Sequence, residues 1–257
     1  MRTAICFSGK LRTFEFAFES IKYHIIDRYK ADVFAHMWEN DAGEEAAASS
    51  PSPYDEKEAI NILNPKEFKI EKHRNFIWDY IWKHCYGIGR PPGLRPERGY
   101  TPANAFWSIY QANKLKRKYE LENNFTYDMV IRCRYDIGLN EESINLHTMI
   151  YVLQNKNIMI GIPGIGFRGP TTWEQANSGQ IPGLDDQFAY GPSREMDIYS
   201  AAFFSQTSAY NDLGEMHKFK DENSLGPEVL LKYHLDKELG KDKIFVNPNI
   251  THRIIRP

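Results

Sequence analysis

The residues with the clearest capacity for chemistry lie at the end of one apolar stretch. Arg132, Arg134 and Asp136 stand two positions apart and follow the apolar run Met129–Ile131. Successive side chains of a β-strand point to opposite faces, so this spacing places all three on one face. Two guanidiniums and a carboxylate are costly to bury without partners. The pattern predicts either a phosphate or diphosphate site, with Asp136 holding a metal or a sugar, or an Arg–Asp ion pair that closes the sheet edge.

A second group lies near the N-terminus, where the apolar stretch 3–7 runs into a turn. Gly9 allows the backbone to turn sharply and a ligand to approach it closely. Lys10 and Arg12 flank that turn, and Thr13 is a candidate N-cap for a helix over 14–26. Backbone amides, a helix N-terminus and two cations favour an anion site. The segment matches neither a Walker loop nor a G-x-G-x-x-G motif, and a solvated basic turn is the alternative.

A pair of adjacent carboxylates, Asp185 and Asp186, precedes the short apolar stretch 188–190. Neighbouring residues of an extended chain face opposite ways, so the two carboxylates have different environments. One can serve as a general base or anchor an acceptor, while the other caps a turn. His36, at the end of the stretch 31–38, is within reach of a ligand but is more often a structural residue in such a position.

The elements that must position these residues alternate along the chain. Apolar runs predict strands at 3–7, 31–38, 68–70, 127–136, 158–162, 188–190 and 244–246, and helical spacing predicts helices at 14–26, 55–63, 75–86 and 102–119 and from 193 and 226. Alternation of this kind is typical of an α/β fold with a mostly parallel central sheet flanked by helices. Ligands of such sheets bind outside the carboxyl ends of the strands. The glycine- and proline-rich segment 87–100 is interpreted as an acceptor or lid loop, or as plain surface.

Composition limits the class of protein. A chain of 257 residues suits one large domain or two small ones, and its net charge of −2 gives no overall basic surplus for nucleic-acid or membrane binding. No stretch approaches the roughly 20 apolar residues of a membrane span, and we see no signal peptide. Cys6, Cys85 and Cys133 lack C-x-x-C spacing, which favours free thiols in a reducing compartment. We therefore expect a cytoplasmic protein whose Cys6 and Cys133 are buried.

Three short motifs together resemble a family of small glycosyltransferases found in bacterial surface-polysaccharide loci and in large viruses. The turn 6–12, read C-F-S-G-K-L-R, is similar to that family's opening strand and S/G-G-x-x-R turn. A helix with Gln111 and Tyr119, followed by the stretch 127–136, is similar to its YD-x-x-x-R-x-R-x-D element. The stretch 185–191, read D-D-Q-F-A-Y-G, is similar to its D-x-F-x-x-G element.

The resemblance implies a GT-A-like single domain over 1–257, with a nucleotide-sugar-binding half at 1–140 and an acceptor-side half at 141–257. It implies transfer of a hexosyl or deoxyhexosyl group from a UDP- or GDP-sugar to a glycan acceptor in surface or viral polysaccharide synthesis, with inversion at the anomeric carbon. The location would be the cytoplasm of a bacterium or of a virus-infected host cell, with no nucleic-acid partner.

The resemblance also suggests residue roles. Donor binding falls to Ser8, Gly9, Lys10, Arg12, Asp32, Arg132, Arg134 and Asp136, and catalysis to Asp185 or Asp186. The usual D-x-D metal motif is replaced by Arg134-Tyr135-Asp136. Asp136 with His252 would hold Mn²⁺ or Mg²⁺, or else Arg132 and Arg134 would neutralise the diphosphate without a metal. The missing first Asp supports an alternative function, a nucleotide- or glycan-binding α/β domain without transfer activity.

Overall fold

The computed structural model describes residues 1–39, 54–72, 74, 102–139, 146–155, 157–165, 183–217 and 227–255. The helix predicted at 75–86 and the segment 87–100 lie outside these residues, as does Cys85.

One sheet joins strands from both halves of the chain. Its eight strands follow the order β3-β2-β1-β4-β7-β6-β8-β5. They are β1 Thr3–Gly9, β2 Asp32–Trp38, β3 Glu67–Glu71, β4 Met129–Cys133, β5 Ile137–Leu139, β6 Ile160–Ile165, β7 Phe188–Gly191 and β8 Ile244–Ile254. Four of these seven neighbouring pairs are parallel: β1·β2, β1·β4, β2·β3 and β6·β8. The predicted α/β fold with a mostly parallel sheet is confirmed for the described residues.

The strand order reverses at β1. The chain moves outward from β1 through β2 to β3 and then returns to place β4 on the other side of β1. The connections that follow β1 and β4 therefore leave the same edge of the sheet. Open α/β sheets bind their ligands at such a switch point, outside the carboxyl ends of the strands.

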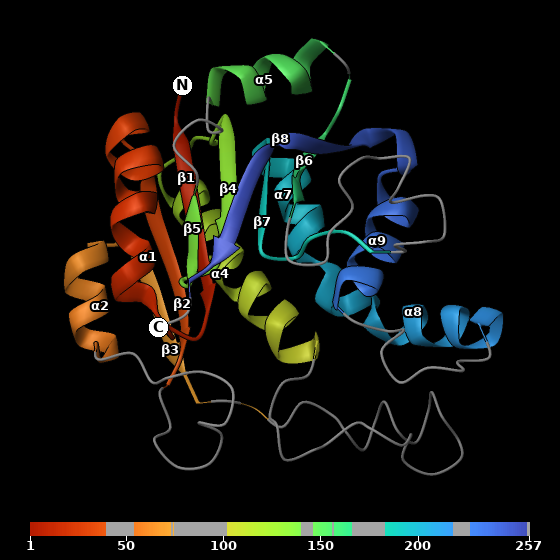
Figure 1. Ribbon diagram of the computed structural model, residues 1–257, viewed down its shortest axis with the longest axis horizontal. Helices are drawn as coiled ribbons and strands as arrows, with labels where there is room; N and C mark the ends of the chain where they lie inside the picture. Colours follow the sequence, from red (N-terminus) through yellow and green to blue (C-terminus); the bar gives the residue numbers. More distant parts are fainter. Residues whose placement is uncertain are drawn as a thin grey trace.

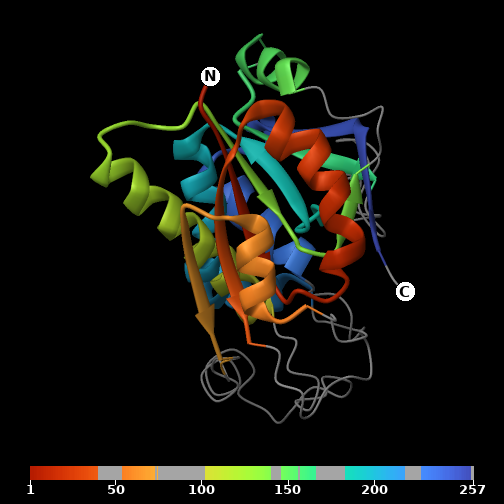
Figure 2. The ribbon, with the colours of Figure 1, turned by 90° about the vertical axis from the view of Figure 1, so that its left-hand side faces the viewer.

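Helices cover both faces of the sheet (Figure 1). On one face pack α1 Phe14–Ile21, the π-helix η1 Lys22–Asp27, α2 Glu56–Leu63 and α5 Leu146–Asn155. On the other pack α4 Pro102–Glu122, α7 Ser193–Ser200, α8 Ala202–His217 and α9 Pro227–Glu238. A short 3₁₀ turn, η4 Lys241–Lys243, leads into β8. Figure 2 shows α1 and α2 in front of the N-terminal strands, with α4 behind them.

This layering explains why the strands appear as continuous apolar runs. In β1, Ile5 and Phe7 pack into the core on the α1 side, whereas Ala4 and Cys6 pack into the core on the α4 side. Strands that are covered on both faces lack the apolar–polar alternation of a half-exposed sheet. Cys6 and Cys133 are buried free thiols, as predicted.

The strand β8 is much longer than the three residues that the sequence indicated. Its first part pairs in parallel with β6, and its last part pairs antiparallel with β5 through Ile137–Ile254 and Leu139–His252. We call β5 and residues 252–254 of β8 the terminal ribbon. The ribbon packs against α1 and the α1-side core, since Ile137 and Leu139 belong to that core.

A fully buried cation fixes α4 and α7 to each other. Lys116 Nζ lies 2.8 Å from Asp197 Oδ1 and 3.1 Å from Glu120 Oε2, and Glu120 also accepts a hydrogen bond from the Tyr127 backbone just before β4. The Lys116 side chain is completely buried, so its charge depends on these carboxylates rather than on water.

Among the helices of the described residues, none has the length and apolar character of a membrane-spanning segment.

We expect Lys116→Met to lower the free energy of unfolding by about 3–5 kcal/mol, because it leaves two carboxylates without their buried partner. Lys118→Met is the matched control: Lys118 lies two positions further along the same helix with a half-exposed side chain, and its loss should change stability by less than about 1 kcal/mol. Urea denaturation of both variants measures the difference. Equal effects would contradict a special role for the buried lysine.

Candidate functional site at the carboxyl ends of β1 and β4

The turn after β1 presents its backbone to open space. Gly9 has a φ of +121°, which glycine adopts without strain, and a Cβ there would meet no atom within 4 Å. Lys10 follows it, and Arg12 also has a positive φ, of 50°. Thr13 precedes α1 as predicted, but its hydroxyl donates to the Ile255 carbonyl at 2.7 Å instead of capping the helix. The turn is therefore held by the end of β8.

The carboxylate of Asp136 joins this turn to the end of β4. Arg134 forms a bidentate pair with it, from Nε to Oδ1 at 2.8 Å and from a terminal nitrogen to Oδ2 at 2.7 Å. Arg12 reaches the same Oδ2 from the β1 turn at 3.2 Å. The Asp136 backbone carbonyl accepts a hydrogen bond from the Ile255 amide at 2.8 Å. We call the side chains of Arg12, Arg134 and Asp136 the arginine–aspartate cluster.

Charge pairing determines the ionisation of Asp136. Burial opposes its negative charge, but the guanidiniums of Arg134 and Arg12 outweigh burial and hold the pKa of Asp136 below its usual value. The Asp136 side chain is 2% exposed, whereas those of Arg134 and Arg12 are 15% and 29% exposed. The cluster thus buries its anion and turns two cations toward the surface. The ion pair considered from the sequence exists, and its two arginine side chains are more exposed than its carboxylate.

Arg132 lies apart from this cluster because β4 ends at Cys133, earlier than the sequence indicated. The Arg132 guanidinium donates to the backbone carbonyl of Gln187, which also accepts from the Arg134 amide at 3.2 Å. Arg132 is buried, and its Nε has no hydrogen-bond partner among the described residues. Its geometry fits the positioning of the 185–187 turn better than direct contact with a donor.

The 185–187 turn meets the terminal ribbon at His252. The Gln187 amide donates to Asp185 Oδ1 at 2.6 Å. His252 Nε2 lies 3.1 Å from Gln187 Oε1 and 3.4 Å from Asp185 Oδ2. Because an amide oxygen only accepts, Nε2 carries the proton of a neutral His252. We call Asp185, Gln187 and His252 the acid–histidine group.

Burial shifts both titratable members of this group. Burial, followed by repulsion from the Asp186 carboxylate, raises the pKa of Asp185 to about 7. Burial, followed by the positive charges of Arg134 and Arg132, lowers the pKa of His252 to about 4. At neutral pH the imidazole is therefore uncharged, while Asp185 is close to the midpoint of its titration. A carboxyl group with a pKa near the working pH is suited to general acid–base chemistry.

The structure brings together most of the predicted site residues. Ser8 is buried at the end of β1 with its hydroxyl unpartnered among the described residues, and Asp186 is buried beside Asp185. Gln187 was missed by the sequence analysis, although it bonds to both Arg132 and His252 and directly follows the carboxylate pair. Its position in that motif was the available signal.

Asp32 is a correction: the structure does not place it in the site. It is the first residue of β2 and pairs with Ala4, five residues before Gly9 on β1. At about 3.3 Å per residue, Asp32 at the amino end of β2 therefore lies roughly 17 Å from Gly9 at the carboxyl end of β1. Asp32 instead accepts a hydrogen bond from the Tyr127 hydroxyl at 2.7 Å, at the amino edge of the sheet.

His36 has the structural role that the sequence favoured. It is fully buried at the carboxyl end of β2, with Nδ1 2.7 Å from the Ser108 hydroxyl and Nε2 2.9 Å from Glu71. Burial lowers the pKa of His36 to about 4 despite the Glu71 carboxylate.

The predicted metal ligands do not fit a divalent cation as they are arranged here. Both carboxylate oxygens of Asp136 already accept hydrogen bonds from guanidiniums, and two cations beside a metal ion would repel it. His252 directs its protonated Nε2 at Asp185 and Gln187. Among the described residues no group of three or more His, Cys, Asp or Glu side chains is arranged to hold a metal.

The lowered pKa of Asp136 predicts a pH-dependent contribution to stability. The ionised carboxylate stabilises the fold above its unfolded pKa of about 3.9, and this contribution is lost as pH falls through the lower folded value. Asp136→Asn should therefore cost about 3–5 kcal/mol at pH 6, and the difference from wild type should shrink below about pH 4. Urea denaturation across this range measures it. Asp242→Asn, at a highly exposed carboxylate, is the control, and a cost for Asp136→Asn that does not change with pH would contradict the ion-pair account.

Comparisons with known proteins complete the description of the site. The sequence matches no family model and no curated protein. Among solved structures, the fold is similar to that of mouse xyloside xylosyltransferase 1 in its apo form, with a TM-score of 0.46 and 10% sequence identity over 96% of this chain and 84% of that chain. A similarity this distant carries no argument about activity, which must be argued from the residues of the site.

Proposed function

We propose that this protein is a glycosyltransferase that moves a hexosyl or deoxyhexosyl group from a UDP- or GDP-sugar to a glycan acceptor, in surface or viral polysaccharide synthesis. One observation carries the proposal: the guanidiniums of Arg12 and Arg134 and the near-neutral carboxyl of Asp185 lie at the same edge of the sheet, at its switch point. A diphosphate needs the cations and an acceptor hydroxyl needs the base. The motif resemblance supports the same reaction.

The donor diphosphate would bind at the turn after β1. Lys10, Arg12 and Arg134 supply cations, and Gly9 leaves room for the phosphates to approach the backbone. Asp136 holds both guanidiniums in position before the donor arrives, so little ordering is needed when it binds. As the bond between the sugar C1 and the diphosphate oxygen breaks, negative charge grows on that oxygen, and prepositioned guanidiniums stabilise it.

Asp185 is the proposed base. In its carboxylate form it would take the proton of the acceptor hydroxyl while that oxygen bonds to C1 from the face opposite the leaving diphosphate. One C–O bond forms as the other breaks, so the anomeric configuration inverts. His252 and Gln187 hold the carboxylate in place through the contacts described above. Because Asp185 is buried, the acceptor must displace the side chains that cover it.

We further propose that the diphosphate is neutralised by the guanidiniums rather than by Mn²⁺ or Mg²⁺. The pairing of both Asp136 oxygens with arginines supports this choice. Arginine forms bidentate hydrogen bonds with phosphate oxygens and remains charged at every relevant pH.

A thermal-shift panel tests donor binding, with UDP, GDP, dTDP and CMP and their common sugars, each with Mn²⁺ or with EDTA. A ligand at 100 times its Kd stabilises by about 2.7 kcal/mol, which raises the Tm by roughly 5–10 °C for a chain of this size. We expect one nucleotide class to give this shift and to retain it in EDTA. Arg12→Gln and Lys10→Ala should reduce it, whereas Lys57→Ala, at an exposed cation on α2, should not.

The other outcomes each overturn part of the proposal. Loss of the shift in EDTA would replace the guanidinium account with a metal ion. A shift without sugar transfer to any glycan acceptor would favour the non-catalytic binding domain. The absence of a shift with every nucleotide would exclude a nucleotide-sugar donor.

The raised pKa of Asp185 predicts the pH dependence of transfer. A base acts only when deprotonated, so kcat/KM should rise with pH and reach a plateau above a midpoint near 7. Asp185→Asn should lower kcat by about 10²–10⁴-fold and remove this midpoint. Asp186→Asn should lower kcat only a few-fold and move the midpoint downward, since it removes the repulsion that raises the Asp185 pKa. Steady-state kinetics from pH 5 to 9 compare them, and full activity of Asp185→Asn would place the base elsewhere.

A further inference from the structure

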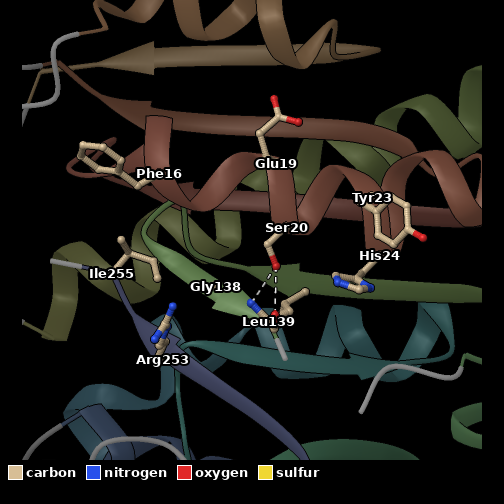
Figure 3. Close-up of a pocket in the computed structure, with 9 residues that line it drawn as sticks. All are labelled: Phe16, Glu19, Ser20, Tyr23, His24, Gly138, Leu139, Arg253 and Ile255. Carbon is tan, nitrogen blue, oxygen red and sulfur yellow. Dashed lines mark hydrogen bonds between the residues drawn. The ribbon is translucent and has the colours of Figure 1, made fainter. Parts of the chain in front are cut away.

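A second hollow lies on the far side of the terminal ribbon from the acid–histidine group. It has a volume of about 410 Å³ and runs between α1–η1 and the ribbon, with Gly138, Leu139, Arg253 and Ile255 on the ribbon side. Figure 3 shows Phe16 and Ile255 at one end and Tyr23 and His24 at the other, with Ser20 between them above Leu139. Of these residues only Ile255 also contacts the site described above, through its backbone bonds to Thr13 and Asp136. We call this hollow the ribbon pocket.

The two aromatic side chains of the pocket are unusually exposed. Phe16 is 60% and Tyr23 71% exposed, whereas other Phe and Tyr side chains of this fold, such as Phe14 and Tyr135, are fully buried. They stand seven residues apart on one continuous helical stretch, so about 10 Å of helix separates them on the same side. Exposed apolar groups gathered at a hollow mark a binding surface more often than isolated ones do.

The two charged side chains that line the pocket have opposite signs, and the other polar groups are neutral or already bonded. Glu19 and Arg253 contribute one negative and one positive charge, so the lining favours neither an anion nor a cation. The Ser20 hydroxyl is held by the backbone of Leu139, at 3.0 and 3.1 Å. His24 is 5% exposed, and its Nδ1 has no hydrogen-bond partner among the described residues. A buried polar atom without a partner is costly, and a bound ligand or water that pairs with Nδ1 would remove this cost.

The backbone at the pocket is also specialised. Tyr23 and His24 lie in the six-residue π-helix η1, and irregular turns of this kind are frequent at functional sites. Gly138 lets Ile255 pack closely against the ribbon backbone at the base of the pocket, because a Cβ at this position would lie 2.8 Å from Cδ1 of Ile255. Pockets of this size, with aromatic walls and a few fixed polar groups, are typical of small-ligand sites.

We propose that the ribbon pocket binds a neutral oligosaccharide. Saccharides have apolar C–H faces that pack on aromatic rings and hydroxyls that need both donors and acceptors. Phe16 and Tyr23 supply two such platforms, Arg253 supplies donors and Glu19 supplies acceptors. Their separation suits a chain of several sugar units rather than one small ion. Binding here requires no nucleotide, and it does not depend on the proposed transfer reaction.

Isothermal titration calorimetry tests the proposal, with maltotetraose, cellotetraose, chitotetraose and xylotetraose added at millimolar concentration to the full chain without nucleotide. We expect at least one tetrasaccharide to bind. Phe16→Ala and Tyr23→Ala should each weaken its affinity about tenfold or more, or 1.4 kcal/mol. Both residues are exposed, so the variants should fold. Phe204→Ala removes a similarly exposed aromatic ring, 61% exposed, from α8 on the other face and should leave the affinity unchanged.

Two results would overturn the proposal: no tetrasaccharide binds the wild-type protein, or binding survives both the Phe16→Ala and the Tyr23→Ala substitution. The nucleotide thermal shift of these variants separates this inference from the proposed function. If the shift is intact and saccharide binding is lost, the pocket is a distinct site. Saccharide binding by wild-type protein that shows no nucleotide shift would keep the pocket and reject the transferase.

Discussion

The structure depends on how one buried carboxylate is neutralised. Asp136 is almost completely buried, and removing such a charge from water costs several kcal/mol unless good geometry compensates. Arg134 and Arg12 compensate from two different strand ends, and the Asp136 carbonyl also holds the end of β8 through Ile255. Three segments that are distant in sequence thus meet at this residue. The Asp136 carboxylate links the turn after β1 to the end of β4, and the Asp136 carbonyl links both to the end of β8.

Such a cluster need not be the most stable arrangement for a buried position. Buried ion pairs can often be replaced by apolar side chains of similar volume at no cost in stability, so stability alone does not account for it. What apolar side chains cannot supply is two guanidiniums held in fixed positions by a buried carboxylate. The Lys116 cluster on the opposite face makes a useful contrast, because its cation is completely enclosed by its partners. The two cations of the arginine–aspartate cluster are instead partly exposed.

Much of the fold could be predicted from the sequence, because strands covered on both faces leave continuous apolar runs and helices leave a 3.6-residue period. The grouping of Lys10, Arg12, Arg134 and Asp136 followed from one rule about strand ends. The same rule would have excluded Asp32, which begins its strand instead of ending it. The contact between Asp185 and His252 could not be predicted, since it depends on β8 bending to pair with β5 after it leaves β6, and no local pattern encodes that path.

The terminal ribbon connects the two proposed sites through the simplest property of a β-strand. Adjacent residues face opposite sides, so His252 points into the acid–histidine group while Arg253 lines the ribbon pocket. Ile255 then contributes its side chain to the pocket and its backbone to Asp136 and Thr13. A ligand that moves the ribbon by a fraction of an ångström therefore changes the distance between His252 and Asp185, on which the position of the proposed base depends. The pocket and the site share one wall, and that wall is only two strands wide. If the ribbon moves as a unit, saccharide binding on one side is therefore energetically coupled to acid–base chemistry on the other.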